Sequence, residues 1–190
     1  MRGESLWIGA ALALLAGTVG AAECRRVNFP ATVAVAGTSL ELNGLGVRKA
    51  TFLKVNVYVA ALYVEHPTHD PAALLTAGGP TELVLRFVRD VGARDIRDGF
   101  AEGFEKNAGA ARPALAARIA QLETWVEDIR TGGGMTFVHV PGTGVEVSVN
   151  GAVKGVIPGE DFARALLAIW IGGRPPNQEL KTGLLGGACG

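Results

Sequence analysis

Residues 42–65 read LNGLGVRKATFLKVNVYVAALYVE, which predicts a glycine-rich turn and then a long strand over residues 50–64. Successive side chains of a strand point to opposite faces. The odd-numbered face is almost wholly apolar and consists of Leu53, Val55, Val57, Val59, Ala61 and Tyr63. The even-numbered face carries Lys54, Asn56 and Tyr58, and Arg48 has the same parity. We expect the apolar face in the core. The polar face is either solvated or forms the polar end of a pocket for a small acidic, mostly apolar ligand.

Shorter strands are predicted on both sides of this stretch. They cover residues 29–35, 39–42, 82–88, 135–140, 145–149 and 152–157. The Asn150-Gly151 pair between the last two runs predicts a type I′ hairpin, because both central residues of that turn need positive φ.

Helical patterns lie between and after the strands. One covers residues 71–77, and a second contains the apolar stripe of Ile96, Phe100 and Phe104. A third starts at Pro113 and is ended by Gly132, and two more cover residues 159–171 and 178–185. The helix from Pro113 is predicted to continue to Ile129. Gly99 and Gly103 beside the first stripe weaken a helix, so close packing against them is expected. Strands at both ends with helices between them predict an α+β fold, an antiparallel sheet with helices on one side.

The composition favours one folded globular domain. The chain has 190 residues, of which 48% are hydrophobic and 19% charged. Lys+Arg and Asp+Glu are both 18, so the formal net charge is zero. This balance gives no electrostatic reason to expect nucleic acid or an anionic membrane as a partner.

The first 22 residues have the pattern of a signal peptide. An apolar run over residues 6–19 is followed by Gly20, Ala21 and Ala22, the small residues that a signal peptidase needs. The run is short for a membrane span, and no second one approaches bilayer length. We therefore expect residues 1–22 to be removed and residues 23–190 to form the domain, periplasmic or secreted, with no membrane span after cleavage.

The two cysteines lie near the ends of the mature chain. In an oxidising compartment Cys24 and Cys189 could form a disulfide that joins the termini. Such a bridge would stabilise the fold by about 3–5 kcal/mol on the loop-entropy model. The other interpretation is two free thiols at frayed ends, and the sequence does not decide between them.

Motifs for catalysis, metal or cofactor binding are not found in the sequence. His66, His69 and Asp70 form a short cluster, but Pro67 opposes the helix that would align them as metal ligands. The better candidate is Arg48 with its even-numbered neighbours, because an arginine fork grips a carboxylate or enolate and a tyrosine hydroxyl can add a hydrogen bond.

Three stretches resemble the chalcone isomerase superfamily, especially its bacterial chalcone isomerase-like branch. They read FPATVAVAGTSLELNGLGVRKATFLKVNVYVAALYVE, FVRDVGARDIRDGF and LLAIWIGGRPPNQELKTGLLG. The resemblance implies an open-faced β-sandwich, a large antiparallel sheet covered by a layer of helices, with the ligand between them. It also implies that Arg48 matches the family arginine. In plant isomerases that arginine helps stabilise the phenolate as a chalcone closes to a flavanone, and in the fatty-acid-binding branch it holds the lipid carboxylate.

The sequence departs from the catalytic pattern of the plant enzymes. Their tyrosine and lysine on the helix after the second central strand fall on a segment that here offers Ile96 and Phe100. Their threonine falls near Tyr58, and their polar residue before the C-terminal Ile-Gly falls on Ile169. The resemblance thus implies an anion-binding cleft without the groups that move protons, and no catalytic residue is predicted.

These observations favour an exported, non-catalytic protein that binds a fatty acid or similar amphipathic carboxylate in a cleft between sheet and helices, without cofactor or metal. The predicted ligand-binding residues are Arg48, Tyr58, Asn56, Phe100, Phe104 and Trp170. The alternative is an isomerase, an intramolecular lyase acting on a chalcone-like enolisable substrate with Arg48 as electrophile. A third hypothesis is a structural or accessory protein without a pocket.

Overall fold

The computed structural model describes residues 20–50 and 55–190. Most of the predicted leader, residues 1–22, lies outside the described residues, and so do Leu53 and Lys54. Within the described residues, no helix has the length and apolar character needed to cross a bilayer.

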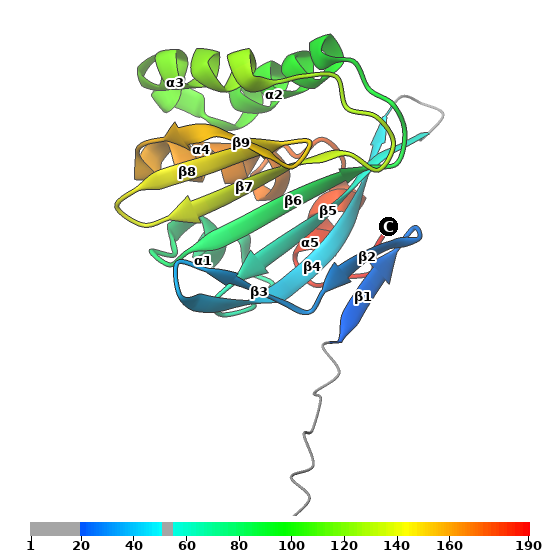
Figure 1. The fold of residues 1–190 in the computed structure, drawn as a ribbon. Helices are drawn as coiled ribbons and strands as arrows, with labels where there is room; N and C mark the ends of the chain where they lie inside the picture. The colour runs from blue at the N-terminus through cyan, green and yellow to red at the C-terminus, as the bar shows by residue number, and fades with distance from the viewer. Residues whose placement is uncertain (1–19, 51–54) are drawn as a thin grey trace, which may run out of the picture.

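The centre of the fold is a seven-stranded antiparallel sheet in the order β3-β4-β5-β6-β7-β8-β9 (Figure 1). Its strands are β3 (Thr32–Val35), β4 (Thr38–Ala50), β5 (Val55–Val64), β6 (Thr81–Phe87), β7 (Gly134–Val140), β8 (Gly144–Val149) and β9 (Ala152–Ile157). A separate hairpin pairs β1 (Ala21–Cys24) with β2 (Val27–Pro30), so the strand predicted over residues 29–35 is divided between two sheets. Asn150 (φ 50°) and Gly151 (φ 82°) join β8 to β9 with the positive φ values that the predicted turn requires.

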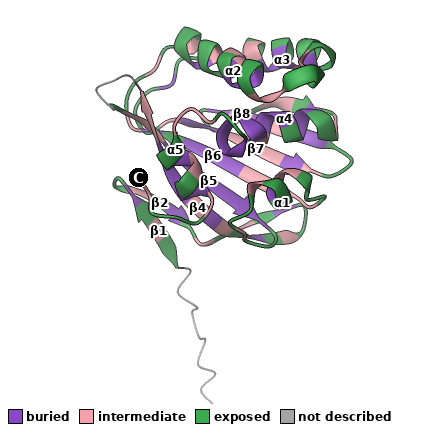
Figure 2. Cartoon of the chain, turned by 180° about the vertical axis from the view of Figure 1, so that it is seen from behind, coloured by how far each residue is buried: buried purple, intermediate pink, exposed green. Residues whose placement is uncertain are grey.

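Helices cover one face of this sheet. They are α1 (Pro71–Thr76), α2 (Ala93–Asn107), α3 (Arg112–Trp125), α4 (Glu160–Ile171) and α5 (Gln178–Leu184), with a short 3-10 turn over Gly109–Ala111. From behind, the middle of the sheet is buried where α1, α4 and α5 cross it (Figure 2). The arrangement confirms the predicted α+β fold, a large antiparallel sheet under a layer of helices.

The sheet has a core on each face. The larger core lies under the helices and includes Ala60, Leu62 and Val64 of β5. The smaller core lies on the other face, under the β1-β2 hairpin, and includes Val59, Ala61 and Tyr63. The prediction that only the odd-numbered face is buried is therefore wrong beyond Val59, because the central strand β5 is covered on both sides.

The glycine-rich segment before Arg48 is part of β4 and not a turn. β4 runs through Gly44 and Gly46 to Ala50. A Cβ atom at Gly44 would lie 2.1 Å from the carbonyl oxygen of Gly183, and one at Gly46 would lie 2.3 Å from that of Leu180. These glycines let the backbone of α5 lie directly against β4. The sequence suggested a turn because the helix that requires them is distant along the chain.

The predicted helix from Pro113 to Ile129 ends earlier, at Trp125. Val126 adopts an extended conformation (ψ 127°), and its carbonyl accepts a hydrogen bond from Arg97 Nη1 at 3.1 Å. Ile129 instead forms a short antiparallel bridge with Val91. Val126 and Ile129 are buried as expected, but contacts with α2 and Val91 replace the helix there.

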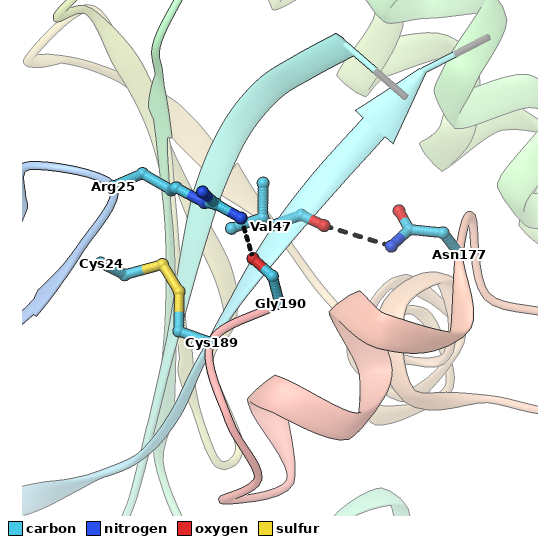
Figure 3. Close-up of a disulfide and its surroundings, with 6 residues drawn as sticks. All are labelled: Cys24, Arg25, Val47, Asn177, Cys189 and Gly190. Carbon is cyan, nitrogen blue, oxygen red and sulfur yellow. Dashed lines mark hydrogen bonds between the residues drawn. A yellow bond between two sulfur atoms is a disulfide. The ribbon is translucent and has the colours of Figure 1, made fainter. Parts of the chain in front are cut away.

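The N-terminal hairpin and the C-terminal tail are joined. Cys24 and Cys189 form a disulfide with a Cα–Cα distance of 6.1 Å, and Arg25 Nη2 donates a hydrogen bond to the carbonyl of Gly190 at 2.8 Å (Figure 3). The hairpin that covers the smaller core is thereby tied to the segment that follows α5.

Candidate functional site

A cavity of about 420 Å³ lies between the sheet and helices α2 and α4. Its size falls in the range of small-molecule sites. The walls consist of Arg48, Ala50, Val57, Tyr58, Leu85, Phe87, Arg89, Asp90, Val91, Gly92, Asp95, Ile96, Gly99, Phe100, Glu102, Gly103, Lys106, Ile169, Trp170, Arg174 and Pro176. Four predicted ligand-binding residues thus meet at one cavity: Arg48, Tyr58, Phe100 and Trp170.

A β-bulge in β5 determines which residues of that strand line the cavity. Arg48 pairs with Tyr58, but Lys49 pairs with Asn56, so Val57 is the extra residue of β5. A bulge redirects side chains on the strand that carries it. As a result Val57 and Tyr58 both line the cavity and Asn56 does not, although strict alternation would put Asn56 beside Tyr58.

Arg48 is partly buried at the cavity wall. Its Nη1 donates a hydrogen bond to the carbonyl of the next residue, Lys49. Among the described residues no carboxylate forms an ion pair with Arg48. Glu102 also lines the cavity, but its pKa is lowered mainly by its hydrogen bond and ion pair with Lys106, and least by Arg48. The guanidinium, which has five N–H donors, therefore keeps donors for an anion.

Tyr58 is held by Trp170. The Trp170 indole Nε1 donates a hydrogen bond to the Tyr58 hydroxyl at 2.9 Å. Because that oxygen accepts from Trp170, its own proton remains available for donation to another group. Burial raises the pKa of Tyr58 to about 12, against smaller lowering effects of the Trp170 hydrogen bond and of Arg48. Tyr58 is therefore a neutral hydrogen-bond donor at any physiological pH.

Aromatic rings form much of the apolar part of the cavity. The Tyr58 and Phe87 ring centroids are 5.3 Å apart, and those of Phe100 and Trp170 are 6.1 Å apart at an edge-on angle of 79°. Phe104, one turn further along α2, does not reach the cavity. It is fully buried against Phe162, with ring centroids 5.8 Å apart.

The glycines of α2 play different parts. A Cβ atom at Gly103 would lie 2.6 Å from Cγ2 of Ile169, so the close packing expected there occurs between α2 and α4. At Gly99 nothing lies within 4 Å of an added Cβ, and this glycine faces the open cavity. The expectation of close packing is wrong for Gly99.

Residues 172–177, between α4 and α5, form part of the cavity rim through Arg174 and Pro176. Asn107 of α2 donates to the carbonyl of Arg174 and accepts from its N–H, both at 3.0 Å. Asn177 accepts from the N–H of Lys49 and donates to the carbonyl of Val47, both at 3.2 Å. Asn177 occupies the N-cap position of α5, but its side chain makes no capping hydrogen bond and bonds β4 instead.

Several rim residues were not found from the sequence. Arg89, Lys106 and Arg174 add positive charge around the opening, and Asp90 and Asp95 add negative charge. Asp90 is engaged by Thr131 and Arg130, and the hydrogen bonds from Thr131 are the main cause of its lowered pKa. The sequence signal for this rim is the Gly-Gly-Arg-Pro-Pro-Asn run over residues 172–177, because its glycines and prolines predict a loop between two helices.

The histidine loop has a structural role. The Asp70 side chain accepts from the N–H of Ala72 at 2.9 Å and caps α1. His69 Nδ1 contacts the carbonyl of Leu185. This loop thus joins α1 to the end of α5, away from the cavity.

Comparison with known proteins agrees with this architecture. The family described as chalcone isomerase-like matches residues 21–186, and the chain belongs to that family. A crystal structure of a fatty-acid binding protein from Arabidopsis thaliana is similar, with a TM-score of 0.69 and 17% sequence identity over 87% of this chain and 96% of that one. At that identity the likeness establishes the shared fold. A comparison with curated proteins finds no match.

Proposed function

We propose that this protein binds a fatty acid or a similar amphipathic carboxylate in the cavity between sheet and helices. The observation that carries the proposal is the polar pair Arg48 and Tyr58, which lies beside the aromatic and aliphatic part of the cavity wall. The guanidinium supplies charge and a planar fork, and the tyrosine supplies one further donor. The hydrocarbon tail would lie against Phe100 and Trp170, with Ile96 and Leu85.

A carboxylate head suits this pair better than a neutral one. Arg48 is unpaired with any described carboxylate, and Tyr58 stays protonated, so both groups offer protons and neither accepts readily. The half-buried position of Arg48 shields the charge from water and strengthens its attraction for an anion. An alcohol of equal length would gain less from the same groups.

The described lining favours binding over turnover. It contains no histidine or cysteine, and its one tyrosine has a pKa of about 12. A general base works best with a pKa near the operating pH. The alternative function, isomerisation of a chalcone-like substrate, keeps Arg48 as electrophile and would need a lining carboxylate as its base. The pKa of Asp90 is lowered by the Thr131 hydrogen bonds and that of Glu102 by Lys106, which moves both away from neutral pH.

We further propose that the chain is exported and acts in the periplasm or outside the cell. The apolar run over residues 6–19 and the following small residues support export. The Cys24–Cys189 disulfide is consistent with an oxidising compartment. Mass spectrometry of the mature N-terminus tests this: it should begin at residue 22 or 23, and an intact Met1 would contradict it.

The binding proposal is tested by lipid extraction and titration. Purified protein should release a fatty acid detectable by mass spectrometry, and delipidated protein should bind decanoate with a change in Trp170 fluorescence. Trp125→Phe leaves Trp170 as the one tryptophan of residues 23–190. Arg48→Ala should lose both signals. Arg86→Ala is the matched control, because Arg86 is an exposed arginine of the same sheet outside the cavity lining.

Unchanged decanoate affinity in Arg48→Ala would contradict the proposal. Arg48-dependent ring closure of naringenin chalcone above the background rate would instead favour the isomerase.

A further inference from the structure

The rim loop over residues 172–177 bears directly on Arg48, although it is separated from that residue by more than a hundred positions. β3 pairs only with residues 38–41 of β4, so none of the described strands lies beside the edge of β4 near Arg48 that faces away from β5. Unpaired strand edges leave peptide groups without partners. Asn177 supplies those partners with one side-chain amide, as Figure 3 shows for its bond to Val47.

Two of the hydrogen bonds of Asn177 lie on either side of Arg48, and a third, longer one goes from its Nδ2 to Glu179 Oε2 at 3.4 Å. Its Nδ2 donates to the carbonyl of Val47 and its Oδ1 accepts from the N–H of Lys49, both at 3.2 Å. The carbonyl of the same Lys49 accepts from the Arg48 guanidinium. Asn177 therefore bonds the two peptide groups that flank Arg48, and the Arg48 guanidinium bonds the carbonyl of the next peptide group, on the other side of the Lys49 Cα.

Arg48 needs such support for two reasons. It lies at the register shift opposite Val57, where the ladder between β4 and β5 is interrupted. It is also two residues from the end of β4. A long, flexible side chain there loses binding energy unless its anchor is fixed before the ligand arrives.

We propose that Asn177 is a positioning residue for the ligand anion: its amide holds the two peptide groups that flank Arg48, and the Lys49 carbonyl that follows them holds the Arg48 guanidinium at the cavity wall. This inference rests on the proposed binding function. It assigns head-group selectivity to a residue that does not itself line the cavity.

The experiment compares decanoate with decanol, which share a tail and differ in charge. In Asn177→Ala, decanoate affinity should fall about tenfold, while decanol affinity changes less than about twofold, because only the charged head uses Arg48. In an Arg48→Ala background, Asn177→Ala should cost less than about twofold further, since the two residues act on one interaction. A merely structural role would weaken both ligands and would add to the loss in Arg48→Ala.

Asn107→Ala is the matched control. Asn107 clamps the same loop at Arg174 with the same pair of backbone bonds but does not touch β4. Its variant should keep the wild-type ratio of decanoate to decanol affinity. If Asn177→Ala does not fold, Asn177→Ser replaces it, because a serine hydroxyl is too short to bond both peptides.

The outcomes separate the two proposals. Arg48-dependent decanoate binding that Asn177→Ala leaves unchanged overturns the positioning role alone. A fall in both ligands equal to that of Asn107→Ala also overturns it. Wild-type protein that binds decanoate independently of Arg48, or not at all, overturns the binding function and the positioning role together.

Discussion

Replacing Tyr58 with phenylalanine removes the oxygen that accepts the Trp170 indole hydrogen bond at 2.9 Å. The phenylalanine ring retains the contact with Phe87 at 5.3 Å, so packing changes little. Trp170 is 2% exposed, and its N–H loses its partner in Tyr58→Phe. A buried donor left without an acceptor costs about 1–3 kcal/mol. Taking about 2 kcal/mol, Tm should fall by about 4–8 °C for a domain of this size.

The assay is thermal unfolding of delipidated protein, followed by circular dichroism in wild-type and Trp170→Phe backgrounds. In Trp170→Phe there is no indole donor, so Tyr58→Phe should cost less than about 0.5 kcal/mol there. Equal losses in the two backgrounds would refute the role given to this hydrogen bond, and so would a wild-type Tm unaffected by Tyr58→Phe.

Three further predictions concern stability and are checked by denaturant unfolding. Gly99→Ala should stabilise the protein by up to about 1 kcal/mol, because its added Cβ lies in open space on a helix. Gly103→Ala should destabilise the protein by about 1–3 kcal/mol, because its Cβ clashes with Ile169. The reverse order of stabilities would contradict the packing of α2 on α4. Cys24→Ser should lower stability by about 3–5 kcal/mol under oxidising conditions, because the bridge closes a loop of 165 residues, and should have no effect on reduced protein. The Arg118 hydrogen bond lowers the pKa of Asp161 from 3.8 to about 2, so the ion pair stabilises the fold above pH 4 and this contribution is lost as the pH falls toward 2. Solvent screening at this half-exposed pair keeps the contribution below about 1 kcal/mol. Asp161→Asn should therefore flatten the plot of unfolding free energy against pH between pH 4 and pH 2 alone.

Local chemistry made much of the fold predictable. The Asn150-Gly151 turn, the Pro71 start of α1 and the apolar stripe of α2 depend on neighbours in sequence, and the structure has each of them. What sequence could not supply depends on distant partners. Gly44 and Gly46 lie against α5, and the helix expected to continue beyond Trp125 gives way to a bridge with Val91.

For the candidate site, the sequence likewise predicted the residues placed by local alternation and missed those placed by distant contacts. Arg48 and Tyr58 share a side by strand alternation, and both reach the cavity. Asn56 follows the same rule but is moved off by a one-residue bulge, which no local signal marks. Asn177 was not among the predicted site residues, because its bond to β4 joins positions that are distant along the chain.

The central claim is that Arg48 and Tyr58 together hold the anionic head of an amphipathic ligand. A crystal structure of delipidated protein reloaded with decanoate tests it most directly. The carboxylate should lie within hydrogen-bond distance of the Arg48 guanidinium and the Tyr58 hydroxyl, with the tail between the sheet and helices α2 and α4. A decanoate whose carboxylate lies in bulk solvent or on the opposite face of the sheet would contradict it.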